Sequence, residues 1–338
     1  MERQSVFFSA PLAAAVRTED LLPPGPGEAL VETRLSAISP GSELLVYRGQ
    51  APGELAVDET IAALGGSFRF PIKYGYAAVG QVIGLGEDTP VEWLGRTVFA
   101  FNPHETHFVA PVAALHPLPD GLTPEAAVFL PNMETAVSFV MDGRPVIGER
   151  VAVVGQGVVG LLTTALLSDF PLTALLTLDA YPLRREWSAR LGATEVVDPA
   201  ELDLTGLGRT PVRRPARSDL TYELSGNPRA LDTAIALTGD HGRIVIGSWY
   251  GDKRVEADLG GRFHRAHMRI IGSQVSALAP RWLGRWTKTR RLDVAWAMLR
   301  RHQPERLITH RLPLARAAEA YRLLDEQAGE VVQVIFTY

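Results

Sequence analysis

The stretch VAVVGQGVVG at residues 151–160 decides the fold, because four apolar residues run directly into a complete GxGxxG pattern. In a parallel strand–turn–helix unit, the first glycine permits a tight turn and the second lets the backbone approach a pyrophosphate. The third lets the helix pack closely on the strand. The apolar run at 161–167 is typical of that helix, whose N-terminal N–H groups and dipole attract phosphate. The pattern predicts a dinucleotide site; the alternative is a strand–turn–helix that binds no ligand.

A second apolar run, at residues 173–178, supports the dinucleotide interpretation. It ends in Asp179, about 20 residues past the last glycine, where a carboxylate can hold an adenosine ribose. Asp179 favours NAD over NADP because a carboxylate repels a 2′-phosphate, but Arg184 could reach back and accommodate that phosphate. The predicted cofactor-binding residues here are Gly155, Gln156, Gly157, Val158, Val159, Gly160, Asp179 and Arg184.

Strands alternate with helices from residue 149 to residue 271, which predicts a doubly wound parallel sheet. The expected strands are 151–154, 173–178, 195–197, 220–224, 243–246 and 268–271, and the expected helices between them are 161–167, 182–191 and 228–237. Ser225 and Ser248 follow the fourth and fifth strands. Such sheets bind ligands at the carboxyl ends of their strands, so both serines are candidate cofactor contacts.

The chain before this region has a β pattern from Ser5 to Pro119. Its short apolar or alternating runs lie at 28–35, 77–84, 97–101 and 107–111, and glycine and proline clusters separate them. Helical periodicity is hard to find there. Short strands without crossover helices predict a compact, barrel-like antiparallel region.

The two regions are joined by a predicted helix. Thr123, Pro124 and Glu125 provide an N-cap, a proline at the first helical position and an acidic first turn. Pro131 should kink or divide the helix that follows.

Beyond residue 275 the sequence predicts helices at 282–301 and 314–324 and a strand at 331–336. A chain that leaves a parallel sheet and ends in β structure is expected to return to its first region, with the nucleotide-binding domain inserted.

Length and composition limit the classes of function. A chain of 338 residues with 46% hydrophobic residues suits two domains with substantial cores. With 34 basic and 38 acidic side chains it lacks the charge typical of nucleic-acid or anionic-membrane binding, which favours a small-molecule partner. We find no basic-then-apolar leader and no apolar run of about 18 residues, so we expect a cytoplasmic protein that does not span a membrane. Cysteine is absent, which excludes thiolate nucleophiles and cysteine-bound zinc.

The chain resembles the medium-chain dehydrogenase/reductases, the superfamily of zinc alcohol dehydrogenases and quinone reductases, over nearly its whole length. The resemblance implies a Rossmann dinucleotide-binding domain at 134–273, inserted in a GroES-like β-barrel catalytic domain formed by 1–133 and 274–338, and a homodimer joined through the nucleotide-binding domains. The stretches that carry it are 37–49, 70–86, 95–98, 118–136, 155–160 and 307–325.

The positions that match the family's catalytic zinc ligands hold other residue types. They fall at Pro40 or its neighbour, at Tyr76 and at Asn132, and the stretch 99–107 is too short for the family's four-cysteine lobe. A catalytic zinc needs about three strong protein ligands, which these residues do not supply. The resemblance therefore implies a zinc-free branch, with no metal site. SPGSE at 39–43, PHETH at 103–107 and PNMETA at 131–136 look most like relatives of the bacteriochlorophyllide hydroxyethyl dehydrogenase, although tetrapyrrole specificity does not follow.

Without a metal, hydrogen-bond donors must stabilise charge on the substrate oxygen, and a titratable group must exchange the proton. Ser42 matches the family's relay hydroxyl and is expected to contact the substrate oxygen or a cofactor ribose; the alternative is a turn residue. Tyr76 is a candidate donor or general acid, or an inert aromatic filling the position of the lost ligand. To act as a general base near neutral pH, Tyr76 would need a pKa below its ordinary value of about 10. Asn132 could donate to an oxyanion, or bridge the helix bend.

Weaker candidates surround these three residues. Glu134 could face the same site, and His104 and His107 either titrate near neutrality or lie on a solvated loop. For the basic run we favour a solvated helix face over a site for a carboxylate-bearing substrate, with Trp282 and Trp286 as packing anchors. That run comprises Arg281, Arg285, Lys288, Arg290 and Arg291.

The sequence thus predicts a metal-independent oxidoreductase that transfers hydride between NAD(H), with NADP(H) possible, and an alcohol or carbonyl compound. The first alternative is reduction of an enone or quinone, in which hydride goes to carbon and Tyr76 stabilises the enolate. The second is a non-catalytic sensor of the nicotinamide redox state.

Overall fold

The computed structural model describes residues 1–58, 60–202 and 216–338. The chain forms two compact units, one of residues 1–131 with 299–338 and the other of residues 132–298. Within the described ranges, none of the helices has both the length and the apolar character needed to cross a bilayer.

The 132–298 unit is built on a six-stranded parallel sheet in the order β10-β9-β8-β11-β12-β13. The chain starts at the central strand β8, extends to one edge through β9 and β10, and then returns to build the other half. This confirms the predicted doubly wound sheet. The strands are β8 (Arg150–Val154), β9 (Ala174–Leu178), β10 (Glu195–Val197), β11 (Ser218–Glu223), β12 (Thr238–Ile246) and β13 (Arg269–Gly272).

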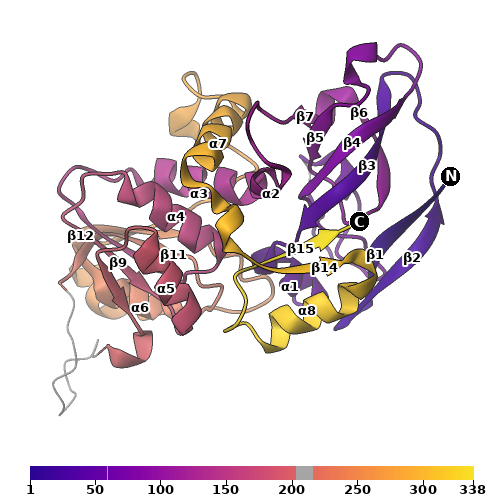
Figure 1. Ribbon diagram of the computed structural model, residues 1–338. Coiled ribbons are helices and arrows are strands. Elements are labelled where there is room, and N and C mark those ends of the chain that lie inside the picture. Colours follow the sequence, from indigo (N-terminus) through magenta and orange to yellow (C-terminus); the bar gives the residue numbers. More distant parts are fainter. Residues whose placement is uncertain (59, 203–215) are drawn as a thin grey trace. The chain divides into compact units, whose positions relative to one another are not determined.

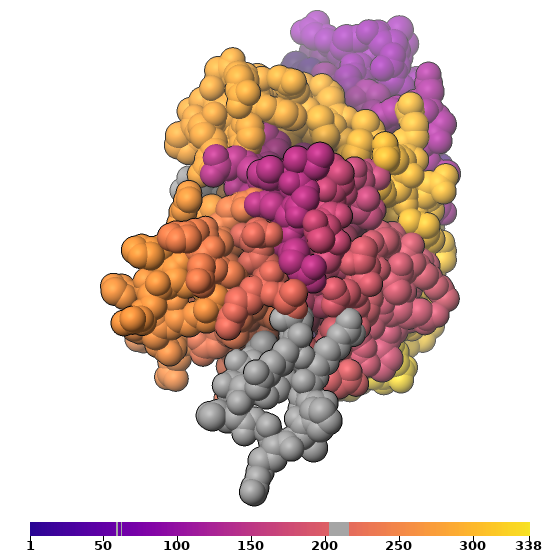
Figure 2. All heavy atoms as spheres, turned by 90° about the vertical axis from the view of Figure 1, so that its left-hand side faces the viewer, coloured from indigo at the N-terminus to yellow at the C-terminus, as the bar shows by residue number. Residues whose placement is uncertain are grey.

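Helices cover both faces of this sheet, because alternate residues of the buried strands face opposite sides. Val151 and Val153 pack with Phe139 of α3, whereas Ala152 and Val154 pack with Leu237 of α6. Figure 1 shows these helices around the sheet, and in Figure 2 the magenta segment that contains α3 lies between the rose and orange halves of the unit. These helices are α3 (Leu130–Gly143), α4 (Val158–Ser168), α5 (Pro182–Arg190) and α6 (Ala230–Leu237), and α7 (Lys288–His302) follows the last strand of the sheet in the chain.

The other unit contains a β1–β2 hairpin and a seven-stranded, mainly antiparallel sheet. Strand β3 is its centre, since it pairs with β4, β6 and β15. Val31, Val82, Val98 and Phe108 form part of the core inside this sheet. The strands are β1 (Glu2–Ala10), β2 (Ala13–Asp20), β3 (Glu28–Ala37), β4 (Ala78–Leu85), β5 (Thr97–Ala100), β6 (His107–Pro111), β7 (His116–Pro117), β14 (Ile308–Pro313) and β15 (Gln333–Thr337).

The end of the chain returns to the first region, as predicted. Ile335 of β15 lies opposite Ala37 of β3 in an antiparallel pair, and β14 joins β15 in parallel. Helix α8 (Ala317–Glu326) belongs to the same unit (Figure 1).

The predicted helix after Thr123 is divided in two. The Thr123 hydroxyl caps α2 (Pro124–Ala127) by accepting a hydrogen bond from the Ala126 amide at 3.2 Å. Helix α3 then begins at Leu130, so Pro131 lies in its first turn, where a missing N–H costs little. The break predicted from Pro131 is confirmed, and it falls just before the proline.

Two helix predictions are wrong. The region expected to be wholly β contains α1 (Pro40–Tyr47), in which Pro40 and Glu43 are ordinary helix-start residues. The helix predicted from Trp282 begins only at Lys288, because Gly284 has φ of +82° and separates a short 3₁₀ turn from α7.

Candidate active site

The three fingerprint glycines have three different surroundings. Gly155 has φ of +93°, and a Cβ there would lie 2.5 Å from the Cα of Ser225. A Cβ on Gly160 would lie 2.0 Å from the carbonyl oxygen of Gly155, so the helix and the turn approach as closely as glycine allows. Gly157 is the N-cap residue of α4, and nothing lies within 4 Å of its Cβ position. The turn is tight at its first and third glycines and open at its second, beside the helix N-terminus, as phosphate binding requires.

Asp179 lies against the fingerprint turn. Its Oδ2 accepts a hydrogen bond from the Gln156 amide at 2.8 Å, and its Oδ1 accepts one from the Tyr181 amide at 2.9 Å. The Arg184 guanidinium is 4.0 Å from Oδ2, while its neighbour Arg185 donates to the Asp179 carbonyl at 2.8 Å. The sequence places this carboxylate near the turn, but it does not reveal that both oxygens hold the backbone.

The two serines after β11 and β12 hold the adjoining loop. The Ser225 hydroxyl donates to Glu223 Oε1, and the Ser248 hydroxyl accepts from the Gly226 amide at 2.8 Å. Glu223 is fully buried and also accepts a hydrogen bond from the Tyr250 hydroxyl. Glu223 and Tyr250 were not predicted. Cofactor contact by the serines stays a prediction, and their described role is to shape this edge of the sheet.

Ser42 and Tyr76 are brought together. Ser42 lies in the first turn of α1, Tyr76 lies two residues before β4, and their hydroxyl oxygens are 2.6 Å apart. Burial raises the pKa of Tyr76 to about 12, although hydrogen bonds from Ser39 and Ser42 oppose the rise. Tyr76 therefore does not have the lowered pKa that a general base would need at neutral pH. At neutral pH the Tyr76 phenol is a neutral hydrogen-bond donor.

A buried carboxylate fixes the start of α1. Glu43 Oε1 accepts a hydrogen bond at 2.6 Å from the amide of Ser39, the N-cap residue of α1. Its Oε2 lies 3.0 Å from His104 Nε2 and accepts a hydrogen bond from the Tyr321 hydroxyl at 2.6 Å. His104 is fully buried, so the alternative of a solvated loop is wrong for this residue, whereas His107 is half-buried. This cluster was not predicted, since its members come from segments far apart in sequence.

Asn132 lies in the first turn of α3 and is 5% exposed. It belongs to the 132–298 unit, whereas Ser42 and Tyr76 belong to the other unit. The hydroxyl pair is thus assembled within one unit, and the role of Asn132 stays a prediction.

Glu134 is paired with Arg291, a buried contact that links α3 and α7. Glu134 Oε1 accepts from Arg291 Nε at 3.1 Å and from its Nη2 at 2.8 Å. Burial raises the pKa of Glu134, and the guanidinium opposes that rise. Arg291 is 1% exposed, so the solvated-face interpretation is wrong for this residue, and its carboxylate partner is Glu134 rather than a substrate. The exposed members of the basic run are Arg281, Arg285, Lys288 and Arg290.

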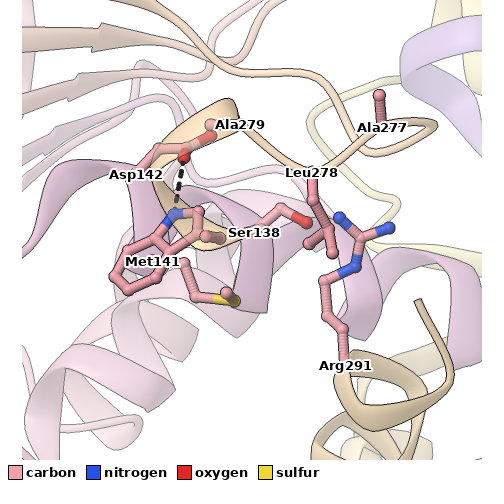
Figure 3. A pocket seen from close by; sticks show the side chains of 8 residues that line it. Ser138, Met141, Asp142, Ala277, Leu278, Ala279 and Arg291 are labelled. Carbon is pink, nitrogen blue, oxygen red and sulfur yellow. Dashed lines mark hydrogen bonds between the residues drawn. The ribbon is translucent and has the colours of Figure 1, made fainter. Parts of the chain in front are cut away.

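A small cavity lies beside Arg291 (Figure 3). Trp282 Nε1 donates to Asp142 Oδ1 at 3.3 Å across one end of it. Its volume is about 10 Å³, enough for about one water molecule and too little for an organic substrate. The lining residues are Ser138, Met141, Asp142, Ala277, Leu278, Ala279, Trp282 and Arg291.

The residue types at the positions that match the family's zinc ligands are not the usual zinc donors. Pro40 has no side-chain donor atom, the Tyr76 hydroxyl is bonded to Ser42 with a raised pKa, and Asn132 offers a neutral amide. In the part of the chain that the structure describes, no three His, Asp or Glu side chains are grouped to hold a metal ion. This donor set does not fit a catalytic zinc.

No protein-family model matches the sequence. The chain is 27% identical over 342 residues to the 2-desacetyl-2-hydroxyethyl bacteriochlorophyllide A dehydrogenase of Cereibacter sphaeroides, which covers 95% of this chain and 94% of the relative. It is 26% identical over 242 residues to the L-threonine 3-dehydrogenase of Stenotrophomonas maltophilia, covering 66% of this chain and 70% of the relative.

Solved structures share the fold across both units. An alcohol dehydrogenase of Escherichia coli, RspB, complexed with NADH, has a TM-score of 0.78 at 18% identity and covers 100% of this chain and 99% of its own. The 2R,3R-butanediol dehydrogenase of Bacillus subtilis has a TM-score of 0.78 at 19% identity and covers 99% of each chain.

Proposed function

Because the chain belongs to the zinc-type alcohol dehydrogenase-like, or medium-chain dehydrogenase/reductase, superfamily, we propose that it transfers hydride between a nicotinamide cofactor and an alcohol or carbonyl compound without a metal. As a member it is an NAD(P)-dependent oxidoreductase. The metal independence and the residues that act on the substrate are our own proposals.

The geometry of the fingerprint turn carries the proposal. Residues 155–160 leave Gly157 open beside the N-terminus of α4, where backbone N–H groups would hold the pyrophosphate. Asp179 would hold the adenosine ribose, and its negative charge supports NAD over NADP. Ser225 and Ser248 would line the same edge of the sheet. When bound, the cofactor supplies the hydride donor or acceptor at its nicotinamide ring.

The hydroxyl pair would act on the substrate oxygen. Reduction of a carbonyl requires one hydride at carbon and one proton at oxygen. A phenol with pKa about 12 is protonated at neutral pH, so Tyr76 would donate to that oxygen while Ser42 holds the phenol in place. The role of Asn132 as a neutral donor remains a prediction from the family resemblance.

The raised pKa also favours the second candidate, reduction of an enone or quinone. In that reaction hydride adds to carbon, negative charge develops on the conjugated oxygen, and a neutral phenol stabilises it without first having to lose a proton. Oxidation of an alcohol needs a base instead, and Tyr76 is a poor one at neutral pH.

Three further expectations belong to this proposal. We propose that zinc has no role, because Pro40, Tyr76 and Asn132 are not zinc ligands of the usual kind. A homodimer and a cytoplasmic location remain predictions from the family resemblance and from the sequence.

The test measures NADH oxidation and NAD reduction by the purified protein with panels of ketones, secondary alcohols, enones and quinones, before and after dialysis against a strong chelator. We expect turnover that survives chelation. Activity lost on chelation and restored by zinc would refute the metal-free mechanism. Turnover confined to enones or quinones would select the second candidate, and tight NADH binding without any turnover would favour a redox sensor.

A further inference from the structure

We propose that His104 is a positioning residue that sets the distance between the Ser42 and Tyr76 hydroxyls. The inference rests on the proposed function of that pair. It comes from the place of the imidazole ring, which contacts both the segment that carries Ser42 and the segment that carries Tyr76.

The contact toward Ser42 runs through Glu43. His104 Nε2 lies 3.0 Å from Glu43 Oε2, and Glu43 Oε1 holds the Ser39 amide at 2.6 Å. Residues 39–43 form the first turn of α1, so the carboxylate fixes the turn that presents Ser42. The Tyr321 hydroxyl donates to the same Oε2 at 2.6 Å, so the imidazole and the phenol together orient this carboxylate oxygen.

The contact toward Tyr76 is made by backbone packing. Gly75 has φ of +116°, and a Cβ there would lie 2.6 Å from both Cδ2 and Nε2 of His104. The ring therefore lies directly against the backbone that precedes Tyr76. Any side chain at position 75 would push the ring and this strand entry apart, which explains the glycine by close approach as well as by its backbone angle.

The ring itself is held on every side. Nδ1 lies 2.7 Å from the Ser36 hydroxyl oxygen, and that oxygen lies 2.7 Å from the Tyr338 hydroxyl oxygen. The Phe336 ring packs edge-on against the imidazole, with 5.1 Å between the ring centroids. His104 has no exposed surface. If Nε2 carries the proton and donates to the carboxylate, Nδ1 is free to accept from Ser36, so a neutral imidazole satisfies both contacts.

These contacts make the ring a spacer between α1 and the start of β4. A smaller or non-bonding residue would let Glu43 turn and Gly75 move, and the 2.6 Å Ser42–Tyr76 contact would loosen. Misplacement of a catalytic group by about 1 Å can cost about a hundredfold in rate.

The test compares His104→Phe, His104→Gln and the matched control His107→Gln, alone and combined with Ser42→Ala. His107 is half-buried, and its ring contacts the neighbouring Thr106 hydroxyl at 3.2 Å. The assay is kcat and KM with the substrate that the panel identifies, beside the Kd for NADH and the melting temperature. We expect His104→Phe to lower kcat by at least about tenfold, with the Kd for NADH within about twofold, and His104→Gln to recover part of the loss because its amide can still donate to Glu43.

A residue that acts through the hydroxyl pair must lose its effect when the pair is removed. In the Ser42→Ala background we expect His104→Phe to change kcat by less than about threefold, whereas a purely structural effect would multiply with that of Ser42→Ala. His104→Gln in the same background provides this comparison if His104→Phe does not fold. Independent effects, or wild-type kcat in both His104 variants, would overturn the positioning role alone. Full activity of Ser42→Ala and Tyr76→Phe would instead overturn the proposed function, and the inference with it.

Discussion

The second and third fingerprint glycines should respond in opposite ways to an added methyl group. Gly157 has open space at its Cβ position and ordinary negative φ, so Gly157→Ala should fold normally but obstruct a pyrophosphate. Gly160→Ala would place its Cβ 2.0 Å from the Gly155 carbonyl and should destabilise the unit itself. We expect Gly157→Ala to keep its melting temperature and weaken NADH binding by about tenfold, or 1.4 kcal/mol. NADH titration and thermal unfolding check both, and wild-type NADH affinity in Gly157→Ala would contradict the assigned site.

Tyr76 offers a prediction about pH. Its pKa is raised to about 12, so the phenol stays protonated through the neutral range, and any stability tied to the protonated form is lost only as the pH rises from about 10 through 12. Tyr76→Phe should lower kcat/KM by about a hundred- to a thousandfold, the range for loss of one oxyanion donor or general acid.

The shape of the pH profile separates a donor from a base. Between pH 6 and about 9.5, the kcat/KM profile of Tyr76→Phe should have the same shape as that of the wild type, at a lower level. A wild-type limb in this range that disappears in Tyr76→Phe would mean that the phenol titrates there and acts as a base. Tyr47→Phe is a suitable control, since Tyr47 is a buried tyrosine of the same unit whose ring stacks on that of Tyr321 and not on Tyr76.

At the scale of elements, the Glu134–Arg291 pair connects α3 to α7. Removing one partner leaves a buried charge without compensation, so Arg291→Met should lower the free energy of unfolding by about 3–5 kcal/mol. Replacing both partners, as in Glu134→Leu with Arg291→Met, should recover much of the loss. Arg281→Met, at an exposed position, should change stability by no more than about 0.5 kcal/mol.

Denaturant unfolding of these variants at pH 5 and pH 8 tests whether the loss of stability grows or shrinks as the pH falls. Burial already raises the pKa of Glu134, and loss of the guanidinium raises it further. When a carboxyl group has a raised pKa in the folded state, the folded protein is more stable with that group protonated. The loss in free energy of unfolding caused by Arg291→Met should therefore become smaller toward pH 5. A deficit that grows as the pH falls would show that the ion pair does not dominate this contact.

The elements also show where sequence patterns are informative. The strands β8 to β13 were predictable because apolar runs between helices leave few alternatives in a parallel sheet. Helix α1 was missed because it has only eight residues, too few to show a clear helical period beside flanking strands. Arg291 looked solvated within a run of exposed cations, since the sequence does not show which cation has a buried carboxylate partner.

At the scale of the whole molecule, the predictable part of the candidate site is the part made by one continuous segment. The fingerprint turn takes its geometry from residues 151–160, so its glycines can be assigned roles from the sequence. The Ser42–Tyr76 contact and the ring of His104 depend on three segments that are far apart in sequence and are brought together in the sheet that contains β3, β4 and β15. Local periodicity does not show which distant segments come into contact, so the sequence pattern does not identify Glu43 as the partner of His104.

The whole chain should report cofactor identity through its stability. A ligand at about 100 times its Kd stabilises the folded state by about 2.7 kcal/mol, which corresponds to a shift of melting temperature on the order of 5 °C for a unit of this size. When the two cofactors are compared at the same concentration, NADH should raise the melting temperature more than NADPH does. Asp179 is held at the fingerprint turn by the Gln156 amide, and its charge opposes a 2′-phosphate. Asp179→Asn keeps the shape and removes the charge, so it should narrow the difference, and Arg184→Ala should weaken whatever NADPH binding exists. If the wild type responds equally to both cofactors, then the 4.0 Å contact of Arg184 with Asp179 already offsets the carboxylate, and the enzyme accepts either cofactor.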